Sequence, residues 1–589
     1  MMKLTRRDVL RSSVAALAHS AWGADGANML ETFNYSGVHL LDGPLRRQCL
    51  HARDLFYNIP DDNFLIGFRA RAGRPAPGTP LAGWYHGDVF NAFGQYLSGM
   101  ARISKALEDA RLRAKALRLM SEWAKTIEPD GYFYYSRKPV TPHYIYDKMM
   151  CGLVDLCDFA HASEAAPLME RITDWAIANL DRSRKRALEA GATYDGNGEW
   201  YTLPENLYRA YELTGAAKYK DFGDVWRYPA YWDMFTRDEP PDPFGFHAYS
   251  HVNTLSSAAM AYSVSDERHY LNVVQRAFEW LERTQMYASG GFGPEEKLVR
   301  PDGSLGRSLE TVHNSFETIC GSWACFKLSR YLMRFTGAAF YGDWIEKILY
   351  NGIGAALPLE PDGSNFYYSE YTLGGGRKGY SPYKWTCCSG TYPQTIADYH
   401  NVIYFKDRDA LYVNLYVPSE VRWVRGDSET VVEQNTRYPE TDNSLLIVSP
   451  RKPEEFALKF RVPRWSSGLK ITVNDKPMAM EAIPGKWATL RRRWSPGDRV
   501  AVQIPMKLAF APIDEQHPKR VAVTYGPVVL ARRDSHILIS GKGDPAQWLE
   551  REGELQFRSR DQPHGPFVPF NKLGPSEGYH MYFDLEPAS

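Results

Sequence analysis

The sequence lacks the features that would assign it to several broad classes of protein. Its 70 basic and 70 acidic residues cancel, and no run of lysine or arginine stands out. Electrostatics therefore give no reason to expect a nucleic acid or an anionic membrane surface as a partner. Beyond the first two dozen residues, no segment reaches about 18 uninterrupted apolar residues, so we also expect no membrane span.

Cysteine is scarce as well. The chain of 589 residues has 7 cysteines, an odd number that cannot all pair, so a fold held together by disulfides is not expected. Buried free cysteines usually pack as small apolar side chains, and we give that interpretation to Cys49, Cys151, Cys157 and Cys325. The other three lie in two short motifs that carry more chemistry.

These two motifs together offer four metal ligands. The first contains Glu317 and Cys320, and the second contains the adjacent Cys387 and Cys388. Three thiolates and a carboxylate suit a borderline-soft divalent ion and are enough to close a tetrahedral shell around Zn2+. The sequence therefore predicts a metal site, either structural or catalytic.

Local geometry supports half of this cluster. The apolar spacing predicts a helix over residues 317–335, in which Glu317 and Cys320 share a face because they are three positions apart. Adjacent side chains diverge on most backbones, so we do not expect Cys387 and Cys388 to be equivalent ligands. One of them would then be free for nucleophilic attack, helped by a nearby cation that lowers its pKa. A vicinal disulfide is the alternative, but such bonds are rare and strained.

Residues 1–24 resemble an export signal. Arg6 and Arg7 precede a short apolar run, and small residues follow it as far as Ala24. Paired arginines of this kind resemble those of the twin-arginine route, which exports folded proteins. We therefore expect the mature protein to be periplasmic or secreted, with its metal loaded and its thiols buried before export.

Helix-like segments dominate residues 35–404. A recurring unit consists of a helix, a turn and a new helix, and the turns fall at Gly215, Asp266 and Gly337. Helical hairpins repeated at wide spacing favour a ring of paired helices, so we predict an (α/α)6 barrel. The loops that join the helices would gather at one end of this barrel and form a site.

The pattern changes in residues 405–589. Apolar and polar residues alternate there in short runs, including 410–417, 455–462, 469–473 and 499–504. Alternation with period two is typical of strands that bury one face. We therefore predict one or more β-sandwich domains after the helical barrel.

Four stretches carry a resemblance to a known family. They are Glu317 with Cys320, the Cys387-Cys388 dipeptide, residues 341–352 and residues 251–254. With them, the sequence is similar to glycoside hydrolase family 127, the β-L-arabinofuranosidases and their relatives, over most of residues 35–535. The resemblance implies an (α/α)6 barrel joined to β-sandwich material. It also implies a retaining enzyme that releases terminal sugars such as β-L-arabinofuranose from oligosaccharides or glycosides.

The resemblance further implies roles for the cluster. By position in the family motifs, Cys387 would be the nucleophile, and Glu317, Cys320 and Cys388 would bind a Zn2+ that Cys387 also contacts. The zinc would keep the nucleophile ionised at neutral pH, because a coordinated thiol is deprotonated. The thiolate would attack the anomeric carbon, and water would later hydrolyse the thioglycosyl enzyme.

A general acid must also protonate the leaving oxygen. In the family this residue is a glutamate after a Gly-Gly segment, and such a segment stands here just before Glu295 and Glu296. We favour Glu296, because the residues after it match those after the family's glutamate, and keep Glu295 as the alternative. His251 and Glu346 match family positions that contact the sugar.

Two positions depart from the family pattern. The metal-site pair is spaced Glu-x-x-Cys rather than Glu-x-Cys, so either the helix starts differently or a bulge restores the geometry. Where relatives carry His-Lys, this chain has Asp147-Lys148. The loss of that histidine from the sugar pocket leaves the preferred sugar open.

Two other classes of function are consistent with the sequence. A helical toroid with a β-sandwich also occurs in polysaccharide lyases, and the many tyrosines permit their chemistry, although net neutrality provides no basic cleft for an anionic polymer. A non-catalytic carbohydrate-binding protein with a structural zinc is the third interpretation. The sequence does not define the oligomeric state, for which a homodimer is one expectation.

Overall fold

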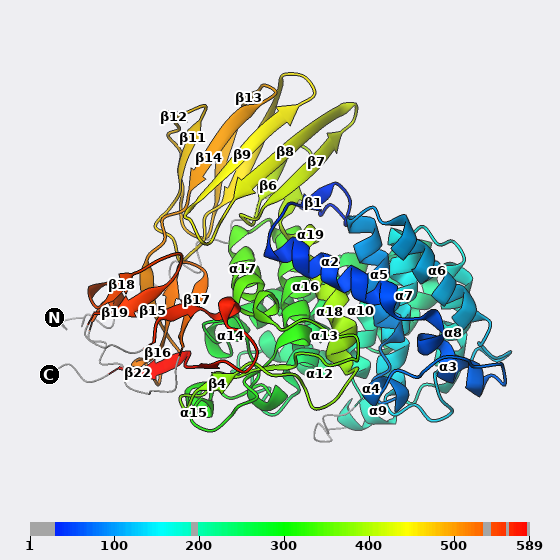
Figure 1. Ribbon diagram of the computed structural model, residues 1–589. Helices are drawn as coiled ribbons and strands as arrows, with labels where there is room; N and C mark the ends of the chain where they lie inside the picture. Colours follow the sequence, from blue (N-terminus) through cyan, green and yellow to red (C-terminus); the bar gives the residue numbers. More distant parts are fainter. Residues whose placement is uncertain (1–29, 190–197, 534–542, 561–564, 586–589) are drawn as a thin grey trace.

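The computed structural model describes residues 30–189, 198–533, 543–560 and 565–585 (Figure 1). The predicted export signal, residues 1–24, lies outside this part of the chain. A helical domain occupies one half of the molecule, and two β-rich regions flank it (Figure 1). In the part that the structure describes, we find no helix that is both long and apolar enough to cross a membrane.

A ring of inner helices forms the centre of the helical domain. Within the described residues, each of six helices packs on the next and the last closes onto the first. Their residues are buried almost all round, as expected of helices inside a core. In order around the ring they are α5 (Phe93–Ala106), α7 (Pro142–Phe159), α10 (Leu203–Thr214), α13 (Ala248–Ser265), α16 (Thr318–Thr336) and α18 (Cys387–Ala397).

A second layer of helices covers this ring. Each outer helix packs chiefly on one inner helix, and several, such as α14, bury only one face. The outer helices are α6 (Ala110–Ala124), α8 (Ala165–Asn179), α11 (Ala217–Val225), α14 (Arg268–Thr284), α17 (Gly342–Asn351) and α2 (Pro44–Asn58). The predicted (α/α)6 barrel is therefore confirmed. Shorter helices fill the connections, namely α3 (Asp61–Arg71), α4 (Gly83–His86), α9 (Ser183–Glu189), α12 (Pro229–Trp232), α15 (Ser304–Ser308) and α19 (Tyr399–Val402).

The turns between inner and outer helices follow the recurring sequence unit. Gly215, Asp266 and Gly337 directly follow α10, α13 and α16, and they adopt φ angles of 71°, 56° and 70°. A left-handed residue at this position ends a helix and lets the chain reverse, and glycine adopts it without strain. The repeated unit seen in the sequence is thus the passage from an inner helix to its outer partner.

A β-sandwich follows the barrel and stands against α17 and α19 (Figure 1). Its larger sheet has the order β1 (Val38–Leu40), β7 (Ser419–Arg425), β8 (Ser428–Thr436), β9 (Asn443–Pro450), β14 (Asp498–Gln503), β11 (Lys470–Val473) and β12 (Lys476–Pro477). The facing sheet has the order β13 (Trp487–Trp494), β10 (Glu454–Arg461), β6 (Ala410–Val413) and β5 (Tyr404–Lys406). Because β1 precedes the barrel, the lead-in of the chain joins the sheet that follows it.

The last part of the chain adds a third sheet with its own apolar cluster. The cluster is built from large side chains such as Trp548, Phe557 and Phe567. The sheet has the order β15 (Leu508–Pro512), β16 (Arg520–Tyr525), β17 (Val528–Arg532), β20 (Phe567–Pro569), β19 (Phe557–Ser559) and β18 (Leu549–Arg551), with β22 (Tyr582–Asp584) also paired to β16. The β-rich second half predicted from the sequence is confirmed, and this sheet extends it.

A buried ion pair joins the barrel to the sandwich and accounts for Glu346. Arg461 of β10 is fully buried and lies 2.8 Å from the carboxylate of Glu346 on α17. Tyr438 and Trp465 also donate hydrogen bonds to Glu346, at 2.8 and 2.9 Å. These contacts occupy both carboxylate oxygens and place Glu346 at the domain interface, and the sugar contact that the resemblance implies stays a prediction.

Removal of the buried cation should destabilise the protein. We predict that Arg461→Ala lowers the free energy of unfolding by about 3–5 kcal/mol, because it leaves buried carboxylates without their partner. Arg422→Ala is the control, since its pair with Glu420 is solvent-exposed and should contribute at most about 1 kcal/mol. Denaturant unfolding of both variants measures the difference. Equal losses in the two variants would contradict a structural role for the Arg461 pair.

Candidate active site and metal centre

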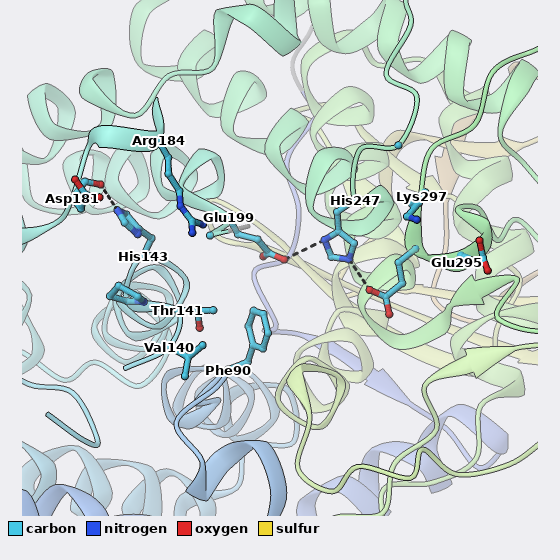
Figure 2. A pocket seen from close by; sticks show the side chains of 14 residues that line it. Phe90, Val140, Thr141, His143, Asp181, Arg184, Glu199, His247, Glu295 and Lys297 are labelled. Carbon is cyan, nitrogen blue, oxygen red and sulfur yellow. Dashed lines mark hydrogen bonds and ion pairs between the residues drawn. The ribbon is translucent and has the colours of Figure 1, made fainter. Parts of the chain in front are cut away.

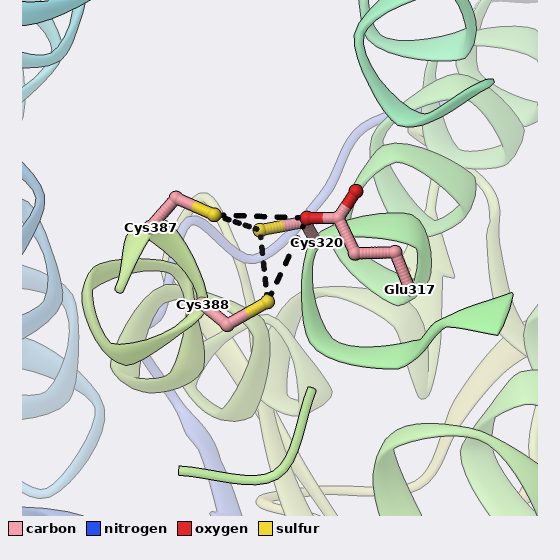
Figure 3. Close-up of side chains that lie close together, drawn as sticks. All are labelled: Glu317, Cys320, Cys387 and Cys388. Atoms are coloured by element: carbon pink, nitrogen blue, oxygen red, sulfur yellow. Dashed lines mark hydrogen bonds between the residues drawn. The ribbon is translucent and has the colours of Figure 1, made fainter. Parts of the chain in front are cut away.

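The four predicted metal ligands meet at the ends of two inner helices. Glu317 directly precedes α16, Cys320 lies in its first turn, and Cys387 and Cys388 are the first two residues of α18. The sulfur of Cys320 lies 3.4 Å from that of Cys388 and 3.9 Å from that of Cys387. Both sulfurs of the adjacent pair lie 3.7 Å from Oε1 of Glu317. We call this group the Glu–Cys cluster, and Figure 3 shows its four side chains facing one another.

The spacing within the Glu–Cys cluster fits a tetrahedral metal. Zinc binds thiolate sulfur at about 2.3 Å, so two sulfurs of one tetrahedral shell lie about 3.8 Å apart. The distances of 3.4 and 3.9 Å agree with this value. All four ligand atoms lie within 4.8 Å of one another, and their side chains are buried. The cluster could therefore hold a metal ion.

The adjacent cysteines differ from our expectation. We expected the side chains of Cys387 and Cys388 to diverge and leave one outside the site. Both instead point into the cluster, because the start of α18 places consecutive side chains on the side that faces α16. The Glu-x-x-Cys spacing is accommodated by the helix start, since α16 begins at Thr318 and Glu317 belongs to the short strand β2 (Phe316–Glu317).

Electrostatics separate the three thiols. Burial raises the pKa of Cys320 and of Cys388 well above the ordinary value. Hydrogen bonds from these two thiols lower the pKa of Cys387 well below it, and the hydroxyl of Tyr367, 3.5 Å away, also lowers it. Cys387 is also the one thiol of the three with measurable exposure, at 7%. It is therefore the sulfur best suited to exist as an accessible thiolate.

His247 joins the Glu–Cys cluster to two further carboxylates. It directly precedes α13, and its Nε2 lies 3.4 Å from Glu317 and 3.2 Å from Glu296. Its Nδ1 lies 3.3 Å from Glu199 (Figure 2). These carboxylates raise the pKa of His247 well above its ordinary value although burial opposes the shift. The sequence patterns did not single out His247, although it stands four positions before His251.

Of the two acid candidates, only Glu296 reaches the cluster. It is partly buried, lies next to His247 and accepts a hydrogen bond from Tyr368. Glu295 is exposed and points away from His247 (Figure 2). Both residues have left-handed φ angles, 52° and 60°, so the backbone of this turn is strained in a way typical of functional loops. The His247 contact lowers the pKa of Glu296 although burial opposes it.

A cavity of about 680 Å³ opens over these residues. Residues next to four inner-helix starts line it, namely Phe90 before α5, Thr141 before α7, Glu199 before α10 and His247 before α13. Glu295 and Glu296 line it as well. The Glu–Cys cluster lies at the starts of the two remaining inner helices, α16 and α18. The starts of all six inner helices therefore lie at one end of the barrel and surround the site.

Two other predicted positions lie beneath the site. His251 is fully buried, donates from Nδ1 to the carbonyl of His247 at 2.9 Å, and packs against aromatic rings such as Tyr201. Burial lowers the pKa of His251 to about 3, so it supports His247 as a neutral core histidine. Asp147 and Lys148 form a buried ion pair of 2.8 Å, and Asn206 donates to Asp147.

Metal affinity should depend on pH. Burial raises the pKa of Glu317 to about 8, although the His247 contact opposes it, and burial also raises the pKa values of two thiols. Because these groups bind metal only after they lose protons, affinity should rise from pH 6 to 9 by about tenfold per pH unit for each proton released. Competition with a chromophoric chelator measures it. An affinity independent of pH, or unchanged in Cys320→Ala, would contradict this site.

Comparisons with known proteins agree with this arrangement. The family model described as "Beta-L-arabinofuranosidase, GH127 catalytic domain" matches residues 37–401, and the GH127 middle domain matches residues 410–506. A search of curated proteins finds no match. These assignments favour a glycosidase over the lyase and the non-catalytic binding protein.

Solved structures give the same fold. A GH127 β-arabinofuranosidase aligns with a TM-score of 0.73 and 17% identity, covering 95% of this chain and 98% of that one. A GH127 β-L-arabinofuranosidase from Geobacillus stearothermophilus T6 aligns with a TM-score of 0.71 and 18% identity, covering 94% and 100%. Because its catalytic-domain model matches more than half of the sequence, the chain belongs to glycoside hydrolase family 127 and is a glycosidase.

Proposed function

We propose that this protein is an exported, zinc-dependent retaining glycosidase that releases a terminal β-L-arabinofuranose or a similar sugar from oligosaccharides. One observation carries the proposal: the buried Glu–Cys cluster is joined through His247 to Glu296, which lines an open cavity. The proposed proton donor thus lines the pocket, and His247 joins it to the cluster that contains the proposed nucleophile. The paired arginines Arg6 and Arg7 support export.

Cys387 is the proposed nucleophile. Its sulfur is the most accessible of the cluster, and it lies at the N-terminus of α18, where the helix dipole favours negative charge. Zinc held by Glu317, Cys320, Cys388 and Cys387 would supply one property, an ionised thiol at neutral pH. The Cys387 thiolate attacks the anomeric carbon and displaces the leaving oxygen, which gives a thioglycosyl enzyme.

Glu296 and His247 are proposed to supply the proton as a pair. A lone general acid would need a raised pKa, yet His247 lowers the pKa of Glu296. The two groups are 3.2 Å apart, so one proton is shared between Nε2 of His247 and the carboxylate, and the pair titrates as a unit. This proton passes to the leaving oxygen from Glu296. In the second step Glu296 accepts a proton from water, which attacks the anomeric carbon and releases the sugar with retained configuration.

A network of buried polar side chains packs against the Glu–Cys cluster. Gln95 accepts from Tyr144 at 2.9 Å and donates to Thr391 at 2.8 Å, and Thr391 lies 3.2 Å from the sulfur of Cys320. These hydroxyl and amide groups are buried and bonded to one another, so they hold the cluster in place. The Asp147–Lys148 pair is satisfied internally, so the residue that replaces the family histidine is committed to the core.

Replacement of the proposed acid tests this function directly. The zinc-loaded protein should hydrolyse 4-nitrophenyl β-L-arabinofuranoside, and Glu296→Gln should lower kcat/KM on an oligosaccharide by about 10²- to 10⁴-fold. The loss should be smaller on the nitrophenyl glycoside, whose leaving group needs little protonation. Azide should partly rescue the variant and give a glycosyl azide of retained configuration.

The neighbouring residue provides the matched control. Glu295→Gln removes an exposed carboxylate from the same turn, so its activity should stay within about twofold of the original, in line with other exposed substitutions. If Glu295→Gln lost activity and Glu296→Gln kept it, the assignment of the acid would be reversed. Absence of hydrolysis across β- and α-linked furanosides and pyranosides would overturn the proposed function itself.

A further inference from the structure

A row of aromatic side chains runs from the cavity to the surface. Phe90 lines the cavity, and the ring of Trp84 lies 5.4 Å from it at an interplanar angle of 34°. The ring of Tyr383 lies 5.8 Å beyond Trp84, at 36°. Phe90 and Trp84 are partly buried, whereas Tyr383 is 59% exposed. We call these three rings the aromatic ledge.

The ledge begins next to the reacting groups. The rings of Trp84 and Tyr367 meet edge to face at 6.3 Å, and the hydroxyl of Tyr367 is 3.5 Å from the sulfur of Cys387. One side chain therefore separates the ledge from the proposed nucleophile. At its other end, Tyr383 reaches solvent.

The backbone holds the ledge in place although its outer ring is exposed. The Trp84 amide donates to the carbonyl of Lys384 at 3.1 Å, which ties the two loops together. Gly83 has a φ of 62°, and a Cβ there would lie 2.1 Å from the same carbonyl oxygen, so this contact requires glycine. Asn365 donates to the carbonyl of Tyr383 at 3.2 Å. The rings are thus pre-organised, which lowers the entropic cost of binding.

Exposed apolar side chains lie near the opening of the cavity to solvent, which we call its mouth. Tyr383 and Val140, at 59% and 61%, are among the most exposed large apolar side chains of the described residues. Val140 lines the cavity, and its amide donates to the carbonyl of Asp88 in the loop that carries the ledge. Exposed apolar side chains that continue a binding pocket mark a surface for ligand contact.

The direction in which the substrate leaves the cavity determines which of its sugars can contact the aromatic ledge. The terminal sugar must enter the cavity to reach Cys387 and Glu296, so the rest of the molecule must leave through the mouth. Aromatic rings bind the apolar C–H faces of sugars, and tyrosine adds a polar edge. Lys384, the cation beside Tyr383, is already paired with Asp362, which favours an uncharged sugar over a uronate.

We propose that the aromatic ledge binds the neutral sugar residues on the leaving-group side of the bond that is cleaved. This proposal rests on the proposed function, because it places the terminal sugar in the cavity. It makes the protein an enzyme for oligosaccharide chains, in which the second and third sugars contribute to recognition.

Paired substrates test the ledge. A glycosyl fluoride contains only the terminal β-L-arabinofuranose, whereas a trisaccharide with the same terminal sugar also covers the ledge. For Tyr383→Ala and Trp84→Ala, we expect the ratio of kcat/KM on the trisaccharide to that on the fluoride to fall about tenfold, mainly through KM. Val424→Ala, which removes an equally exposed side chain from β7, should leave both values unchanged. An unchanged ratio in the Tyr383 variant would overturn the proposal.

A binding measurement separates this proposal from the proposed function. If the original protein hydrolyses neither substrate, the proposed function fails, and calorimetric titration with the trisaccharide then decides on the ledge. Binding that weakens about tenfold in Tyr383→Ala supports the ledge as a sugar-binding surface. Binding of equal strength in both proteins, or no binding by either, overturns it.

Discussion

The six inner helices all begin at the same end of the barrel, and the site depends on this constraint. Helix starts carry unpaired amide groups and a partial positive charge, so they stabilise thiolates and carboxylates that would otherwise be costly to bury. Cys387, Glu317 and His247 all stand at such starts. The opposite end of the barrel carries buried ion pairs. There Arg102 pairs with Asp155 at 2.7 Å and with Asp398 at 3.1 Å, close to the helix ends.

Segments outside the inner helices also position the site. The strand β2, which contains Glu317, pairs with β3 (Tyr368–Ser369), and this register sets Tyr368 directly opposite Glu317. Tyr368 in turn binds Glu296, so one two-stranded ribbon positions a metal ligand and the proposed acid. Farther along the same segment, the buried Lys378 donates to the carbonyls of Phe570 and Leu573 at 2.7 and 3.0 Å. The C-terminal part of the chain thereby braces the segment that carries Tyr368.

Much of this arrangement could be predicted from sequence, because short-range spacing encodes it. Glu317 and Cys320 are three positions apart at a helix start, and the Gly and Asp turns give the helical repeat. Contacts between distant segments could not be predicted in this way. Glu346 lies on a family-like helix, but its carboxylate is taken by Arg461, which is more than a hundred residues away in sequence. His247 was missed because its importance comes from three carboxylates that only the fold brings together.

Bond formation between a cysteine sulfur and the sugar is the step that defines the proposed mechanism. It is tested most directly by mass spectrometry of protein quenched during turnover of a slowly released substrate, followed by peptide mapping. We predict a mass increase of one sugar residue on the peptide that contains Cys387, with the other cysteines unmodified. A sugar attached to a carboxylate, or turnover with inverted configuration and no adduct, would contradict it.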